Sequence, residues 1–155
     1  MGQYWMCVNL DKCEFIDPRK LGAGLKLFEQ LANTPGTGAA LVVLCAAMPE
    51  PRGGGDLRAN PEGGEVVVGR WAGDRIALVG DYAEDSDLPP QFEASRIYDE
   101  CLQEGDEGYP GRYKDISNLV AAVIEKELGG RFVGDGWAEF ITPESETRRS
   151  LTNGV

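Results

Sequence analysis

The residues that could bind a ligand are densest in GRWAGDRIALVGDYAED, residues 69–85. The guanidinium groups of Arg70 and Arg75 could hold an anion in bidentate fashion, and Trp71 could stack on a planar group. Asp81 could orient a hydroxyl or an amine. We therefore expect a small-molecule or peptide site here, with the candidate ligand-binding residues Arg70, Trp71, Asp74, Arg75, Asp81 and Tyr82.

The same residues also allow a purely structural interpretation. Asp74 could cap its own turn, Arg70 and Arg75 could neutralise neighbouring acids, and Trp71 could fill the core. The sequence leaves both interpretations open.

Negative charge is concentrated in one stretch of the chain. The formal net charge is -11, and residues 81–110 carry ten acidic residues against Arg96 alone. This field repels phosphate backbones, which argues against nucleic acid as a partner, and it attracts a basic protein or cations. The candidate partner-binding residues are Glu84, Asp85, Asp87, Asp99 and Glu100. The alternative is a solvated surface that keeps the protein soluble.

Recognisable catalytic signatures are missing from the sequence. There is no GxGxxG after a strand, no GxxxxGK[ST] and no GxSxG. The chain has no histidine, which removes every Ser–His or Cys–His relay and the mixed Cys/His zinc sites. The acidic loop lacks the spacing of a calcium-binding EF-hand. We expect no metal and no cofactor, and the missing signatures favour a binding protein over an enzyme, although catalysis by carboxylates stays open.

The four cysteines, Cys7, Cys13, Cys45 and Cys101, include no CxxC pair. The N-terminal residues do not have the pattern of a secretory signal, and no apolar run reaches the roughly 20 residues that span a bilayer. We therefore expect free thiols, a cytoplasmic location and no membrane partner. Cys45 ends an apolar run and is expected to be an inert core thiol.

Hydrophobic periodicity and the glycine and proline positions predict the elements that position these residues. The expected strands are two around a turn at residues 9–12, a buried one over residues 39–48 (with a short buried helix as the alternative), a hairpin over 65–82 and a last short strand or hairpin over 131–142. The expected helices run from residue 18 or 20 to 32, over 91–103, and over 116–128 after the cap Asp115.

These elements predict an α+β fold, with a mainly antiparallel sheet built from hairpins and about three amphipathic helices packed on one face of it. Residues 1–142 form the expected single domain, and residues 143–155 the expected polar, flexible tail. The loop over residues 49–64, rich in glycine and proline, could act as a lid.

Three segments, MGQYW, KLGAGLKLFE and GRWAGDRIALVGDYAE, carry a resemblance. Together they make the chain similar to a family of short, uncharacterised, mostly bacterial proteins that open with MGQYW. The resemblance runs from Met1 to about Phe140. It implies a recurring stand-alone domain and brings no activity, cofactor or functional residue with it.

Two functions follow as hypotheses. The first is a non-catalytic acidic binding protein, of an immunity or inhibitor type, that engages a basic partner through the 81–110 face. The alternative is a small-molecule-binding protein or carboxylate-based enzyme, with its site on the 69–82 hairpin under the loop over residues 49–64.

Overall fold

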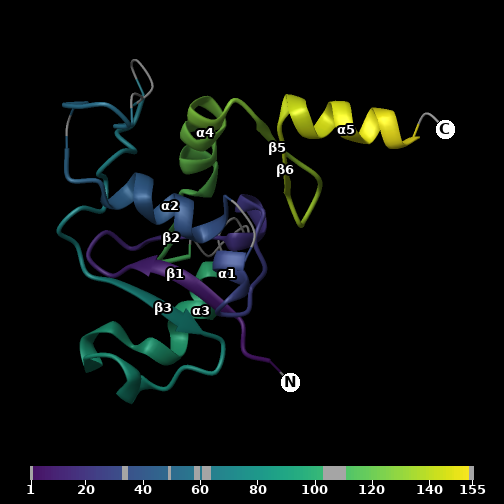
Figure 1. The fold of residues 1–155 in the computed structure, drawn as a ribbon. Coiled ribbons are helices and arrows are strands. Elements are labelled where there is room, and N and C mark those ends of the chain that lie inside the picture. Colours follow the sequence, from purple (N-terminus) through teal and green to yellow (C-terminus); the bar gives the residue numbers. More distant parts are fainter. Residues whose placement is uncertain are drawn as a thin grey trace.

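The computed structural model describes residues 2–32, 35–48, 50–57, 60, 64–102 and 111–153. Its central sheet has the strand order β3-β1-β2-β4 (Figure 1). Strand β1 (Trp5–Asn9) pairs antiparallel with both β2 (Glu14–Ile16) and β3 (Ile76–Gly80), and β4 (Lys114–Asp115) joins β2 in parallel. The expected α+β fold with a mainly antiparallel sheet is confirmed.

The helical elements are the 3-10 turns η1 (Pro18–Leu21), η2 (Asp85–Asp87) and η3 (Pro90–Phe92) and the α-helices α1 (Glu29–Ala32), α2 (Gly36–Cys45), α3 (Ala94–Leu102), α4 (Ser117–Leu128) and α5 (Pro143–Asn153). A second, two-stranded sheet contains β5 (Arg131–Val133) and β6 (Glu139–Ile141). Among the described residues, no helix is long and apolar enough to cross a membrane.

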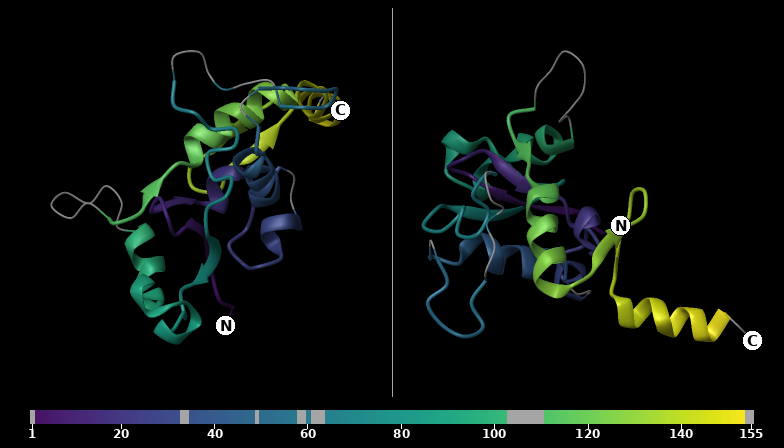
Figure 2. Two further views of the ribbon diagram at one scale, coloured as in Figure 1. Left: turned by 90° about the vertical axis from the view of Figure 1, so that its left-hand side faces the viewer. Right: turned by 90° about the horizontal axis from the view of Figure 1, so that it is seen from above.

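Helices cover both faces of the central sheet, not one face as expected. Met6 and Val8 of β1 pack in a cluster with Ile97 of α3, whereas Cys7 packs in a second cluster with Leu44 of α2 and the buried side of α4. Alternate residues of a strand point to opposite faces, so the sheet is a middle layer between α3 and the α2–α4 pair. Figures 1 and 2 show these layers, with α5 projecting away from them.

The first hairpin is confirmed, but its loop is longer than a two-residue turn. Val8 lies opposite Phe15, and Asn9 lies opposite Glu14. The side chain of Asn9 accepts hydrogen bonds from the backbone N–H groups of residues 11 and 12, and this interaction shapes the loop. None of the four cysteines forms a disulfide bond, in agreement with the expectation.

The predicted buried strand over residues 39–48 is wrong, and the helical alternative is correct. Helix α2 buries Ala40, Val43 and Leu44 and exposes Val42. An apolar run of this length fits a helix or a strand equally well by pattern, so its packing against α4 decides between them. Cys45 is exposed at the end of this helix, which corrects the expectation of a core thiol.

The predicted hairpin over residues 65–82 does not form. The backbone N–H of Gly69 bonds to the carbonyl of Val43 at 2.9 Å, and that of Trp71 bonds to the carbonyl of Leu44 at 2.9 Å. This segment therefore satisfies the open carbonyls at the end of α2, and β3 pairs with β1 instead.

The single helix expected between residues 18 and 32 is broken into η1 and α1. Gly22 ends η1 with a left-handed φ of 77°, and its N–H bonds back to the carbonyl of Pro18. Gly22 and Gly24 have low helix propensity, and the left-handed conformation of Gly22 ends the helix after one turn.

The later elements are confirmed. Helices α3 and α4 lie where the periodicity places them, and Gly129 ends α4 with a φ of 69°. The predicted cap is one residue off: Ile116 is the N-cap of α4 and makes no side-chain cap hydrogen bond, whereas Asp115 ends β4 and accepts a hydrogen bond from the N–H of Ser117 at 2.8 Å. The hairpin β5–β6 turns at the predicted glycines.

Residues 143–153, which belong to the expected polar, flexible tail, form helix α5, and none of the residues of this helix is buried.

Candidate functional site

Arg70 and Trp71 meet at a buried carboxylate, that of Glu14 on β2. The Glu14 oxygens accept hydrogen bonds from Nε of Arg70 at 2.9 and 3.0 Å, from its Nη2 at 2.5 Å, and from Nε1 of Trp71 at 3.1 Å. Trp71 is completely buried, and Arg70 also contacts Glu65 and the carbonyl of Val66. These two side chains therefore hold the segment that follows α2 against the sheet.

Burial alone would raise the pKa of Glu14, but the hydrogen bonds from Arg70 and Trp71 outweigh burial and hold the pKa below its ordinary value. The hydrogen bonds to Glu14 in turn raise the pKa of Arg70. The carboxylate stays ionised and shared between its two donors. Neither the residue type of Glu14 nor its position in a strand indicated, in the sequence, that its side chain would be buried.

The other predicted ligand-binding residues lie apart from this pair. Asp74 accepts hydrogen bonds from Asn9 and Lys12, which fixes the loop after β1. Arg75 pairs with Asp11 and lies 4.8 Å from the centre of the Phe92 ring. The structure therefore does not bring the candidates of the 69–82 segment into one pocket.

Asp81 and Tyr82 follow β3 directly. Asp81 accepts a hydrogen bond from the N–H of Tyr4 at 2.9 Å, whereas Tyr82 is 59% exposed and lines a groove described below. Of the expected lid, the described Leu57 packs beside α2 and α4. Residues 49, 58, 59 and 61–63 of that loop lie outside the described residues.

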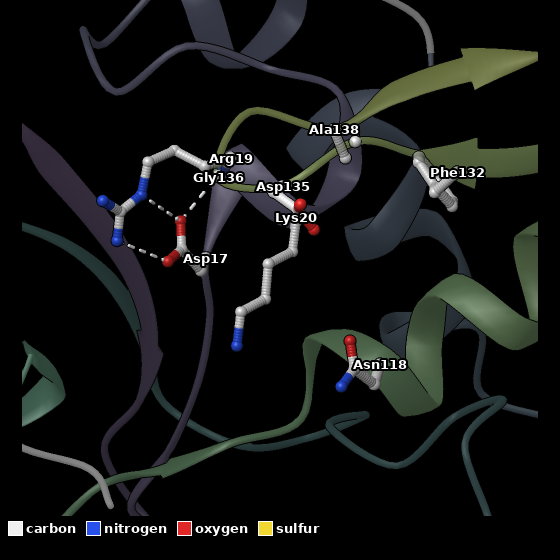
Figure 3. Close-up of a pocket in the computed structure, with 9 residues that line it drawn as sticks. Asp17, Arg19, Lys20, Asn118, Phe132, Asp135, Gly136 and Ala138 are labelled. Carbon is white, nitrogen blue, oxygen red and sulfur yellow. Dashed lines mark hydrogen bonds and ion pairs between the residues drawn. The ribbon is translucent and has the colours of Figure 1, made fainter. Parts of the chain in front are cut away.

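Two adjoining grooves lie between η1, α4 and their neighbours. One has a volume of about 460 Å³, the other about 380 Å³, and both are lined by Asp17, Arg19, Lys20 and Asn118. Figure 3 shows the larger one, with Phe132 and the β5–β6 turn on its far side. We call the pair the polar groove.

Charges in the polar groove are compensated within the chain. The guanidinium of Arg19 donates to the buried Asp17 through Nε at 3.1 Å and Nη2 at 2.7 Å. These hydrogen bonds raise the pKa of Arg19. Lys20 contacts Asp115 at 2.5 Å. Because each of these cations already has a carboxylate and Asp135 also lines the larger groove, the polar groove offers a ligand polarity and shape but no excess positive charge. The sequence did not indicate it, since Arg19 and Lys20 fitted a helix start.

A third groove, of about 340 Å³, lies along the outer side of β3, and we call it the edge groove. The residues that line it include Leu78 to Gly80 of β3 together with Gln3, Trp5, Tyr82, Glu84 and Asp87. Aromatic and apolar surface thus lies directly beside two acids.

Turn η2 presents three of the predicted partner-binding acids. Glu84 and Asp87 form a capping box, in which Asp87 accepts from the N–H of Glu84 at 2.9 Å, and both are exposed. Asp85 accepts from the N–H and the hydroxyl of Ser95 at 3.1 and 2.7 Å, which ties η2 to the start of α3. These hydrogen bonds hold the Asp85 carboxylate in place and lower its pKa.

The remaining two acids lie on α3. Asp99 is exposed, whereas Glu100 is mostly buried and points one oxygen, Oε2, to a place where no described residue donates to it. Glu100 therefore differs in burial from the other four candidate acids, which are exposed. Among the described residues, the exposed acidic surface consists of η2 and the outer side of α3. The acids between residues 103 and 110 lie outside the described residues.

No family model, curated protein or solved structure matches the chain. The resemblance to the MGQYW proteins stays a prediction, and the function has to be inferred from the surfaces described above.

Proposed function

We propose that the protein is a non-catalytic binding protein that engages a basic protein partner through an acidic face formed by Tyr82, η2 and the outer side of α3. The observation that carries the proposal is the position of the exposed Glu84 and Asp87 on the edge groove, beside Tyr82. Within residues 81–102 the sequence has seven acids and one base, Arg96.

The edge groove adds what charge alone lacks. Exposed ion pairs contribute only about 0–1 kcal/mol each, so they mainly set the association rate and the salt dependence. Affinity comes from aromatic and apolar anchors that exclude water. Tyr82 and Trp5 beside the acids could receive the stem and the cationic head of a lysine or arginine side chain.

Catalysis is not part of the proposal, because the carboxylates and arginines that the sequence singled out have structural partners. Arg70 is bound to Glu14, Arg75 to Asp11, and Asp74 to Asn9.

The proposal can be tested with a model basic segment. We would titrate isotope-labelled protein with the peptide acetyl-Lys-Val-Lys-Val-Lys-amide and, separately, with its glutamate analogue. The expected result is NMR shift changes around Tyr82 and η2 with the lysine peptide alone. The affinity should fall steeply as the salt rises from about 0.01 to about 1 M, where the Debye length drops from about 30 to about 3 Å.

Matched variants locate the effect. Glu84→Gln with Asp87→Asn removes two charges and keeps oxygen acceptors for the capping box. Glu50→Gln with Glu144→Gln removes the same charge from exposed positions elsewhere, the second of them on α5. We expect the first pair alone to weaken binding strongly. Binding that ignores salt, or that weakens equally with both pairs, would refute the proposed function.

A further inference from the structure

Strand β3 is an edge of the central sheet. It pairs with β1 only, and no other described strand lies beside it. Leu10 donates to the carbonyl of Arg75, and Asp81 donates to the carbonyl of Tyr4, each at 2.9 Å. Hydrogen-bonded pairs alternate along an antiparallel ladder, so Ala77 and Val79 also bond to β1.

The backbone groups of Ile76 and Leu78 consequently point away from the sheet. Each of these residues offers one N–H and one carbonyl to the outside. The edge is closed one step further on, where the carbonyl of Gly80 accepts from the N–H of Ala83 at 3.1 Å and the side chain of Gln3 lies against Gly80. The open edge is therefore short, and the edge groove runs beside it.

Natural proteins usually protect such an edge with a charge pointing inward, a proline or a bulge. Residues 76–80, IALVG, contain none of these charges or prolines, and Leu78 is 38% exposed. An edge of this kind is a template for a further strand.

The two sides of the edge differ in character. Val79 packs on the α3 side of the sheet, where η2 follows with its acids, whereas Leu78 lies opposite Cys7 on the other side, near Trp5. A strand added here would meet carboxylates on one face and apolar surface on the other. Its side chains alternate between these faces, so basic residues belong at every second position.

We propose that the partner contributes an extended segment, with basic and apolar residues in alternation, that adds to the sheet along β3 through the outward groups of Ile76 and Leu78. This inference rests on the proposed function, because it specifies how the basic partner binds. The other possible occupants of the edge, such as an acidic or a wholly apolar strand, lack the charge that would complement η2.

Substitutions at Leu78 test the pairing while the charge stays constant. Leu78→Pro removes an N–H that does not bond to β1, and proline is tolerated at outward positions of edge strands. Leu78→Val shortens the side chain and keeps the N–H. We expect the lysine peptide to bind Leu78→Pro at least about tenfold more weakly than the wild type and Leu78→Val nearly as well. Thermal unfolding of both variants checks that they fold.

Two further measurements need no variant of the protein. In one, the lysine peptide is N-methylated either at its valines or at its second and third lysines. A pairing strand uses alternate N–H groups, so one of these two peptides should lose binding and the other should keep it. In the other measurement, the amides of Ile76 and Leu78 should exchange rapidly in the free protein and slowly in the complex, whereas Ala77 and Val79 stay protected in both.

The outcomes separate the two proposals. Suppose first that the peptide binds through Glu84 and Asp87. Strand addition is then refuted, and the acidic face remains, by any one of three results: Leu78→Pro binds the peptide as well as Leu78→Val does, both methylated peptides bind like the parent peptide, or the amides of Ile76 and Leu78 exchange at an unchanged rate at saturation. If the peptide fails to bind, or binds regardless of those acids, both proposals are refuted.

Discussion

Glu14→Gln tests the buried contact that joins β2 to the segment after α2. The side chain of Glu14 is 6% exposed and that of Arg70 is 19% exposed, and Arg70 donates three hydrogen bonds to the carboxylate. Glutamine keeps the size and an oxygen for Trp71, but leaves the guanidinium with only the exposed carboxylate of Glu65, 3.3 Å away, as a counter-charge. Removing one partner of a largely buried pair costs about 2–4 kcal/mol of unfolding free energy.

Chemical denaturation followed by circular dichroism near neutral pH measures this loss directly. In a domain of this size, each kcal/mol lowers the melting temperature by about 2–4 °C. The control is Asp11→Asn, which removes the exposed pair with Arg75 and should change the stability little.

The pH dependence separates lost charge from altered shape. The folded-state pKa of Glu14 is held below its ordinary value of 4.5, so its contribution to stability is complete above 4.5 and is lost as the pH falls through the folded-state pKa. The difference between wild type and Glu14→Gln should therefore be constant near neutral pH and shrink in acid. Equal stabilities at neutral pH, or a difference that persists in acid, would refute the reasoning.

Three further predictions concern the packing. Leu44→Ala should lower the unfolding free energy by about 2–5 kcal/mol and Val42→Ala by less than about 1, because α2 buries the first and exposes the second; equal losses would indicate a strand, where both share a face. Gly69→Ala should lower the unfolding free energy, measured by denaturation, by at least about 1 kcal/mol more than Gly73→Ala, since both glycines have positive φ but only at Gly69 would a Cβ lie 2.6 Å from a backbone oxygen. A smaller difference between the two variants would contradict this close approach. Tyr113→Phe should be at least as stable as the wild type, because the buried hydroxyl has no partner among the described residues; a loss above about 1 kcal/mol of unfolding free energy would show that the hydroxyl is bonded. Burial raises the pKa of Tyr113 to about 12, so the variant should also lack the phenolate absorbance that this tyrosine gives near that pH.

The amphipathic helices and short hairpins were predictable because local periodicity decides them. The stripe that includes Ile97 and Cys101 lies on the buried side of α3, and the glycines after α4 end that helix as expected. The exposed acids of η2 were equally predictable, since charged side chains stay in water unless they are paired.

The candidate site could be predicted only in part. The sequence grouped Arg70, Trp71 and Asp81 by proximity along a hairpin, but that hairpin does not form, and their partners, Glu14 and Tyr4, lie far away in the chain. The edge groove has the same origin, because its walls come from the N-terminal residues, β3 and the segment after it.

The sequence by itself determined the α+β class, the confined negative charge and the helices whose hydrophobic period is unmistakable. Only the tertiary structure decided that residues 36–45 are helical, that residues 69–71 bond to the end of that helix and that none of the described strands pairs with the outer side of β3. The physical reason is that an apolar run has no preferred partner of its own. Buried backbone N–H and carbonyl groups need hydrogen-bond partners, and which segments provide these partners depends on contacts between residues far apart in the sequence.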